Sequence, residues 1–181
     1  PEARAGKRAE LGFAEEDLVV GMVTRLVREK GCVEFYQMAA RLAEQWPRAR
    51  FLMVGIPEEK DQSDAVDPVQ LMREYGVADS CIALEHRTDM PELYQAMDVL
   101  VLPSYREGLP RAVIEAGAMG LSVVASDIRG CREVVVAGET GLLTALKDVE
   151  ALVAAVARLL GDRDLRMAMG RAGRERVMQH Y

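Results

Sequence analysis

The chain of 181 residues has 29 acidic and 23 basic side chains, a formal net charge of -6 at pH 7. This balance argues against a general affinity for nucleic acid or for an anionic membrane surface, but it leaves room for a local basic pocket. Half of the residues are hydrophobic and only 5% are aromatic, so we expect a core built mainly from Val, Leu, Ala and Met. The length fits one domain.

The three cysteines, Cys32, Cys81 and Cys131, lie far apart and form no C-x-x-C pair. This spacing predicts neither a disulfide framework nor a zinc site, and it is typical of a cytoplasmic protein. No apolar run reaches the roughly eighteen residues that a membrane-spanning helix needs, and no secretory leader is visible. Because the chain begins at Pro1 and stops within a helical pattern, we expect a fragment of a longer protein.

Short apolar runs alternate along the chain with segments in which apolar residues recur at helical spacing. After a polar opening, the runs that predict buried strands are 18–23, 51–55, 81–84, 99–102, 122–125 and 141–143. The segments that predict helices are 32–46, 69–76, 91–97, a helix opening at Pro110, 148–160 and 164–180, and the acidic stretch 57–67 predicts the longest loop. Continuously apolar strands between amphipathic helices indicate a parallel sheet covered on both faces. We therefore predict a single Rossmann-like α/β domain over 1–181, with about six strands and helices on both faces.

Ligands of such sheets bind beyond the carboxyl ends of the strands, at the topological switch point. The connection after the first strand contains two cations there, Arg25 and Lys30. Cationic side chains and helix-terminal amides in this place would hold a diphosphate. Two solvated loop side chains explain this segment equally well when it is taken alone.

The connection 103–110, after the fourth long strand, ends in Pro110, which suits a first helical turn. Gly108 would let the backbone approach a ligand closely. Amides near Gly108 and Leu109 would then point from the start of the helix toward an anion.

Two glutamates, Glu107 and Glu115, belong to this connection and its helix. Glu115 lies among small and apolar residues, where a carboxylate needs a partner or water because burying a lone charge is costly. An exposed helix face, or an ion pair with Arg111, would also explain Glu115 without any ligand.

The order and spacing of these segments resemble the C-terminal, donor-binding domain of the retaining GT-B glycosyltransferases of family four, the group 1 glycosyltransferases. The matching segments are Thr24-Arg25-Leu26, Lys30-Gly31, Pro103-Ser104-Tyr105-Arg106-Glu107-Gly108-Leu109-Pro110, Glu115-Ala116, Gly130-Cys131-Arg132-Glu133-Val134-Val135 and Gly141-Leu142-Leu143.

The resemblance implies a role for each matching residue. Arg25 and Lys30 correspond to the diphosphate-binding cations, and Glu107 to the first glutamate of a paired motif, near the donor sugar. These three residues are the implied catalytic set.

The implied substrate-binding residues are Gly108, Leu109, Glu115, His86 and Arg87. Glu115 corresponds to the glutamate that binds the ribose hydroxyls. Gly108 and Leu109 would supply backbone contacts to sugar and phosphate, and His86 and Arg87 would border the nucleobase.

The resemblance further implies transfer of a sugar from a nucleoside diphosphate to an acceptor with retention of configuration, and it leans toward bacterial surface or lipid-linked oligosaccharides. No cofactor and no metal are expected. Asp162-Arg163-Asp164 matches a metal-binding Asp-x-Asp only formally, because an Asp between two helices is an ordinary cap. The saccharide or lipid-linked acceptor would be held by an N-terminal domain that is absent here, so the chain alone should transfer little. We expect a cytoplasmic protein, peripheral to the inner membrane at full length.

A nicotinamide dehydrogenase would need G-x-G-x-x-G after the first strand, which residues 24–31 lack. A nucleotide-sugar epimerase of the same two-domain shape stays open, and so does a non-catalytic nucleotide-binding module, although such a module would not explain paired cations together with paired glutamates.

Overall fold

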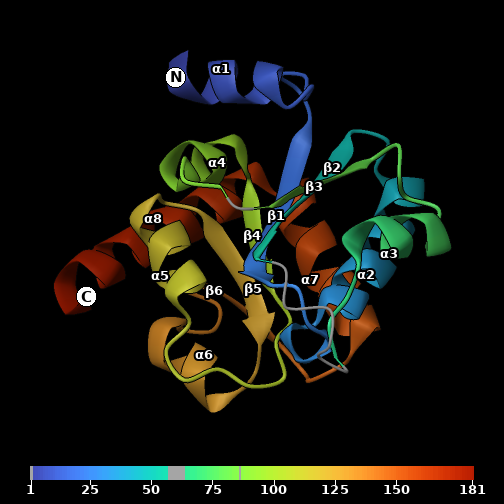
Figure 1. The fold of residues 1–181 in the computed structure, drawn as a ribbon. Coiled ribbons are helices and arrows are strands. Elements are labelled where there is room, and N and C mark those ends of the chain that lie inside the picture. Colours follow the sequence, from blue (N-terminus) through green and yellow to red (C-terminus); the bar gives the residue numbers. More distant parts are fainter. Residues whose placement is uncertain (1, 57–63, 86) are drawn as a thin grey trace.

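The computed structural model describes residues 2–56, 64–85 and 87–181. Within them, six parallel strands form one sheet in the order β3-β2-β1-β4-β5-β6, with helices on both faces (Figure 1). The strands are β1 Leu18–Arg25, β2 Ala49–Ile56, β3 Cys81–Glu85, β4 Val99–Leu102, β5 Ser122–Ser126 and β6 Gly141–Thr144. This confirms the predicted fold class. The strand order reverses between β1 and β4, which places the topological switch point there.

The helices are α1 Glu2–Glu10, α2 Cys32–Gln45, α3 Pro68–Glu74, α4 Met90–Ala96, α5 Arg111–Ala118, α6 Arg129–Val134, α7 Val149–Gly161 and α8 Arg163–His180, with a 3-10 helix η1 over Arg28–Lys30. Buried side chains of α2, α3 and α7 share one hydrophobic core, and those of α4, α5 and α6 share another. Helix α8 packs against α5 and β5. No helix in the described part of the chain is long and apolar enough to cross a membrane.

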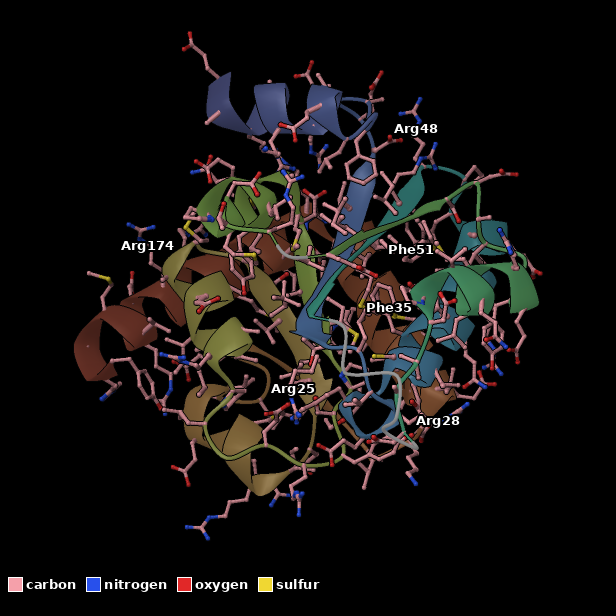
Figure 2. All side chains as sticks on the ribbon, in the orientation of Figure 1. Arg25, Arg28, Phe35, Arg48, Phe51 and Arg174 are labelled. Carbon is pink, nitrogen blue, oxygen red and sulfur yellow. The ribbon has the colours of Figure 1, made fainter. Side chains whose placement is uncertain are left out.

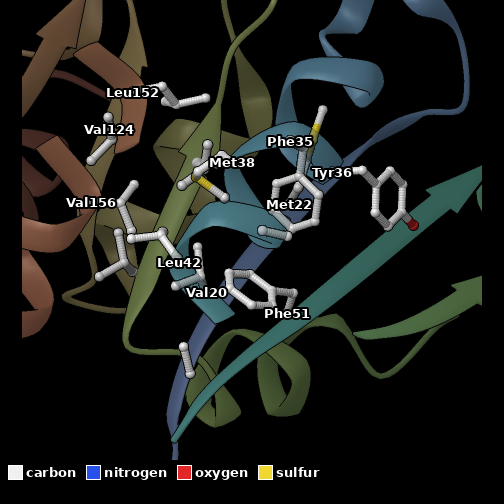
Figure 3. Packing of buried hydrophobic residues seen from close by; sticks show 14 of the residues in the cluster. Val20, Met22, Phe35, Tyr36, Met38, Leu42, Phe51, Val124, Leu152 and Val156 are labelled. Carbon is white, nitrogen blue, oxygen red and sulfur yellow. The ribbon is translucent and has the colours of Figure 1, made fainter. Parts of the chain in front are cut away.

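Each buried strand serves both cores, because successive side chains point to opposite faces of a sheet. In β2, Phe51 and Met53 join the core under α2, whereas Leu52 and Val54 join the core under α4 and α5. Phe51 meets Phe35 of α2 edge to face, with ring centroids 6.3 Å apart (Figure 3). Burial on both faces explains why the strands appear in the sequence as continuous apolar runs.

Helix α2 starts beside the switch point, at the carboxyl ends of the strands, and leads back to the start of β2. It begins after Gly31, whose φ of 78° is left-handed and favours glycine. It ends at Gln45, with Trp46 as its C-cap residue just before Pro47. The Trp46 ring lies against Gly161 at the end of α7, where an added Cβ would lie 3.3 Å from it.

The N-terminal segment differs from the expected polar opening, because residues 2–10 form helix α1. Figure 1 shows α1 lying across α4. Arg8, which is 3% exposed, donates to the carbonyls of Ala96 at 3.0 Å and Asp17 at 2.9 Å and to the Asp98 carboxylate at 2.6 Å. Arg4 donates to the same carboxylate at 2.7 Å. The contact is therefore made largely by charged groups.

Two further points refine the predicted elements. Pro110 adjoins α5 as its N-cap residue, with φ -76°, so the helix begins one residue later than expected. Residues 129–134 form helix α6, which is not among the helices predicted from the sequence. Residues 57–63 of the predicted acidic loop lie outside the described residues.

Candidate functional site

A cavity of about 750 Å³ opens at the carboxyl ends of β1, β2 and β4, beside the switch point. Its wall is made by Val23, Thr24, Arg25, Lys30, Val54, Gly55, Arg87, Thr88, Met90, Leu102, Glu107, Leu109, Pro110, Arg111, Ala112 and Glu115. This volume is within the usual range for small-molecule sites, about 300–1,000 Å³. The position is the one expected for the ligand of an open parallel sheet.

Most of the residues singled out from the sequence lie in this wall, namely Arg25, Lys30, Glu107, Leu109, Glu115 and Arg87. Gly108 is exposed beside the wall, and nothing lies within 4 Å of where its Cβ would be. Its backbone therefore borders open space that a ligand can occupy. His86 lies outside the described residues.

Lys30 and Glu107 form an ion pair in the wall, with 2.9 Å between Nζ and Oε1. Their side chains are only 12% and 14% exposed. The Lys30 ammonium also donates to the carbonyl of Arg106 at 3.2 Å. An ammonium has three donors, so after these two contacts one donor is left for an oxygen in the cavity, as far as the described residues show.

Arg25 is the last residue of β1 and lies near the centre of the molecule in Figure 2, whereas Arg28 of η1 lies at its margin. The Arg25 side chain is about half exposed and pairs with Glu29 at 3.3 Å. Only Arg25 of these two arginines lines the cavity. Together with Lys30, Arg87 and Arg111 it gives the wall four cations.

The Glu115 carboxylate is oriented by a buried tyrosine. The Tyr94 hydroxyl, on α4, donates to Glu115 Oε2 at 2.8 Å. Burial, and then the bond to Glu115, raise the pKa of Tyr94, so the phenol stays protonated and remains a donor. Among the described residues, Glu115 forms no ion pair with Arg111, so the ion-pair explanation is wrong. Glu115 is exposed, as the alternative of an exposed helix face requires. Tyr94 could not be singled out from the sequence, because an aromatic residue on an amphipathic helix looks like an ordinary core residue.

Arg87 lines the cavity wall, and two carboxylates outside the wall accept hydrogen bonds from its guanidinium. It donates to Asp89 at 2.7 Å and to Glu10 of α1 at 3.1 Å. Lys7 also donates to Asp89, at 2.6 Å. Arg87 and Lys7 hold the pKa of Asp89 well below its usual range, so this group of four charges stays ionised at neutral pH.

Two glycines let neighbouring segments contact the backbone of the loop 103–108. A Cβ at Gly31 would lie 2.2 Å from the Pro103 carbonyl oxygen, and one at Gly130 would lie 2.4 Å from that of Glu107. Neither distance is tolerable for a real side chain, so both positions need glycine. The loop that carries Glu107 is thus held between the starts of α2 and α6.

Asp162 caps α8, as the sequence predicted: its Oδ1 accepts from the Leu165 amide at 2.9 Å. In the part of the chain that the structure describes, no three His, Cys, Asp or Glu side chains are grouped as a metal ion would need. Cys32, Cys81 and Cys131 are buried free thiols.

A parallel sheet with cations and carboxylates around a cavity at its switch point places the chain in the Rossmann-like, doubly wound class of α/β domains. The model of the family glycosyl transferases group 1 matches residues 4–176, and the chain belongs to this family. It is 30% identical over 166 residues to the capsular polysaccharide biosynthesis glycosyltransferase CapM of Staphylococcus aureus, covering 92% of this chain and 43% of that protein.

Solved structures show the same fold. The C-terminal domain of the glycosyl transferase group 1 family protein LpcC of Francisella tularensis superposes with a TM-score of 0.87 at 22% identity, covering 100% of this chain and 94% of that one. HepE of Anabaena, solved in complex with UDP-glucose, superposes with a TM-score of 0.91 at 24% identity, covering 100% of this chain and 49% of that one. The chain thus has the fold of the family's C-terminal domain. It spans less than half the length of the curated relatives it matches.

Proposed function

We propose that this chain is the donor-binding half of a retaining glycosyltransferase, which moves a sugar from a nucleoside diphosphate to an acceptor. The observation that carries the proposal is that four cations, Arg25 and Lys30 among them, and two glutamates line one cavity at the switch point, although they come from distant parts of the sequence. Crystals of HepE with UDP-glucose support a nucleotide sugar as the donor.

Arg25 and Lys30 would hold the diphosphate. Cleavage of the bond between the anomeric carbon and phosphate leaves negative charge on the departing diphosphate and an oxocarbenium-like sugar. The Lys30 ammonium is already fixed by Arg106 and Glu107, so it need not reorganise as that charge grows. By analogy with oxyanion donors, losing one such contact should cost about 3 kcal/mol, roughly a hundredfold in rate.

Glu115 would bind the ribose, and Arg87 would border the base. Tyr94 holds one oxygen of the Glu115 carboxylate, and the remaining acceptor sites can take ribose hydroxyls. Glu107, held in place by Lys30, would lie beside the donor sugar. Gly108 and Leu109 would supply backbone contacts.

The acceptor half of the site would come from another domain. Leu109 lines the cavity yet is 51% exposed, an arrangement suited to contact with a second domain or an acceptor. We propose a saccharide or lipid-linked acceptor, by similarity to a capsular polysaccharide enzyme, and a cytoplasmic location at the inner membrane.

The first test is calorimetry of the 181-residue chain with UDP, GDP and ADP in the presence of a chelator. One of them should bind, because Arg25 and Lys30 would take the place of a metal ion at the diphosphate. Lys30→Met should weaken the binding at least tenfold, whereas Arg28→Met, an exposed cation on the same 3-10 helix but outside the cavity wall, should not. A strict need for magnesium would contradict metal-independent binding, and equal effects of the two variants would contradict the role of Lys30.

The second test is product analysis with the complete protein and a nucleotide sugar. Transfer gives a glycoside, whereas an epimerase gives a new free or nucleotide sugar. The 181-residue chain alone should transfer near background even at saturating donor. Alignment of two substrates can lower a barrier by about 7–11 kcal/mol, and half a cleft loses that contribution. Equal rates for the chain and the complete protein would place the acceptor site within these residues.

A further inference from the structure

The loop 103–108, which carries Glu107, is also held by a pair of side chains outside the cavity wall. The Tyr105 hydroxyl donates to Glu34 Oε1 at 2.6 Å. Glu34 lies in the first turn of α2 and is only 8% exposed. Burial, and then the bond to Glu34, raise the pKa of Tyr105, which keeps the phenol a donor.

The second oxygen of Glu34 indicates that this pair is not the most stable arrangement for the site. Oε2 is buried and has no hydrogen-bond partner among the described residues. An under-satisfied buried carboxylate lowers stability, and apolar side chains of similar shape could replace both partners at little cost. A role beyond packing would explain why a buried glutamate occupies this position.

The same tyrosine makes two further contacts with other segments. Its amide donates to the Glu29 carbonyl at 2.8 Å, which joins the loop to η1. The Lys147 ammonium lies 4.4 Å from the centre of its ring. Lys147 has φ 61°, in the left-handed region that residues with a side chain rarely adopt. Three segments therefore converge on Tyr105.

We propose that Glu34 and Tyr105 are positioning residues of the donor site. Their hydrogen bond fixes the loop 103–108. The Arg106 carbonyl and the Glu107 carboxylate, which belong to this loop, are thereby placed to accept hydrogen bonds from the Lys30 ammonium. The pair touches no ligand and acts through Lys30 and Glu107. This inference rests on the proposed function, because it assumes that Lys30 holds a diphosphate.

The test compares a nucleoside diphosphate with its monophosphate, using UDP and UMP, or GDP and GMP if the calorimetric panel selects guanosine. Tyr105→Phe removes only the hydroxyl. It should weaken the diphosphate about tenfold and the monophosphate less than about twofold, because base and ribose are bound elsewhere. General destabilisation would lower both affinities equally.

Tyr75→Phe is the matched control. The Tyr75 hydroxyl accepts a hydrogen bond from Gln37 at 3.3 Å outside the cavity wall, and its loss should change neither affinity. Glu34→Gln retains an oxygen acceptor for Tyr105 and should keep the wild-type ratio of diphosphate affinity to monophosphate affinity. Glu34→Leu removes that acceptor and should lower the ratio as Tyr105→Phe does. If Tyr105→Phe leaves the ratio where Tyr75→Phe leaves it, the positioning role is overturned.

Hydrogen–deuterium exchange without ligand separates this inference from the proposed function. Tyr105→Phe should speed amide exchange in a peptide covering 103–110 at least several-fold and leave β1 and β2 unchanged, whereas Tyr75→Phe should not affect that peptide. Faster exchange in a protein that binds no diphosphate would retain the loop-holding role and overturn the proposed function. Unchanged exchange would overturn the positioning role whatever the protein binds.

Discussion

Arg87 lines the cavity and donates to Glu10, a residue of the N-terminal helix, at 3.1 Å. The two residues are 77 positions apart in sequence. Asp89 accepts hydrogen bonds from both Arg87 and Lys7. Charged side chains of α1 therefore help to hold Arg87 at the cavity wall. The orientation of a cavity residue thus depends on a helix that precedes the first strand.

Glu10→Gln should therefore change nucleotide affinity without unfolding α1. Glu10 is half exposed, and exposed ion pairs contribute little, so we expect a change of no more than about fivefold. The melting temperature should stay within about 2 °C because Arg8 still holds α1 in place. Calorimetry and thermal unfolding measure the two quantities. Glu16→Gln, at an exposed position outside this group, is the control, and an equal effect there would contradict the coupling.

Asp98→Ala should strongly destabilise the chain. The Asp98 carboxylate accepts from Arg4, from buried Arg8 and from the Val19 amide. Its removal leaves the Arg8 charge buried without its anion, which should cost about 3–5 kcal/mol. Urea denaturation measures the change. Asp127→Ala removes an exposed partner of Arg132 and should leave the midpoint unchanged. A similar small effect of both variants would show that α1 docks by other contacts.

Glu115→Gln and Glu107→Gln should separate two parts of the donor. Glu115→Gln should weaken the nucleoside diphosphate itself by about tenfold, because it loses charged hydrogen bonds to the ribose. Glu107→Gln should reduce mainly the affinity for the nucleotide sugar and its turnover. Calorimetry with the nucleoside diphosphate and the nucleotide sugar distinguishes them. If both variants bind both ligands equally, the two roles are wrongly assigned.

The three cysteines should be unreactive in the folded chain. Burial raises the pKa of Cys32, Cys81 and Cys131 to about 12, whereas an unfolded thiol has a pKa of about 8.5. At pH 8, iodoacetamide should label the native protein slowly and all three thiols in urea, as mass spectrometry would show. Rapid labelling of the native chain would contradict the burial of the thiols.

The same shift makes stability depend on alkaline pH. Between about pH 8.5 and 12 the folded thiols keep protons that the unfolded chain has lost. Stability from this source is therefore complete below about pH 8.5 and should fall by about 1.4 kcal/mol per pH unit for each thiol above it. Urea denaturation at pH 7.5 and 9.5 measures how steeply the free energy of unfolding falls with pH, and Cys81→Ala should make this fall less steep. An unchanged slope in that variant would contradict the assignment.

The strands could be predicted because both faces of the sheet are buried. Every side chain of 99–102 is apolar and buried, and an apolar run this short favours a buried strand over a buried helix. The cavity residues could be located because ligands of such sheets bind at the carboxyl ends of the strands, and the family resemblance supplied roles for Arg25, Lys30, Glu107 and Glu115.

Helix α1 and the supporting hydrogen bonds could not be predicted in this way. Arg4 and Arg8 attach α1 through carbonyls and Asp98, and charged contacts leave no apolar period in the sequence. Glu34 in a first helical turn looks like a favourable helix-dipole residue. Only the fold brings it within 2.6 Å of Tyr105, 71 positions later.

The packing of Trp46 against Gly161 provides a spectroscopic reporter. Trp46 is the only tryptophan in the sequence, and it lies at the opposite end of α2 from Gly31, about 21 Å away for a helix of this length. Its fluorescence therefore reports the junction of α2 and α7 and not the cavity. Unfolding of every variant can be followed by this emission with nucleotide present, because a bound base would be too distant to stack on the indole ring.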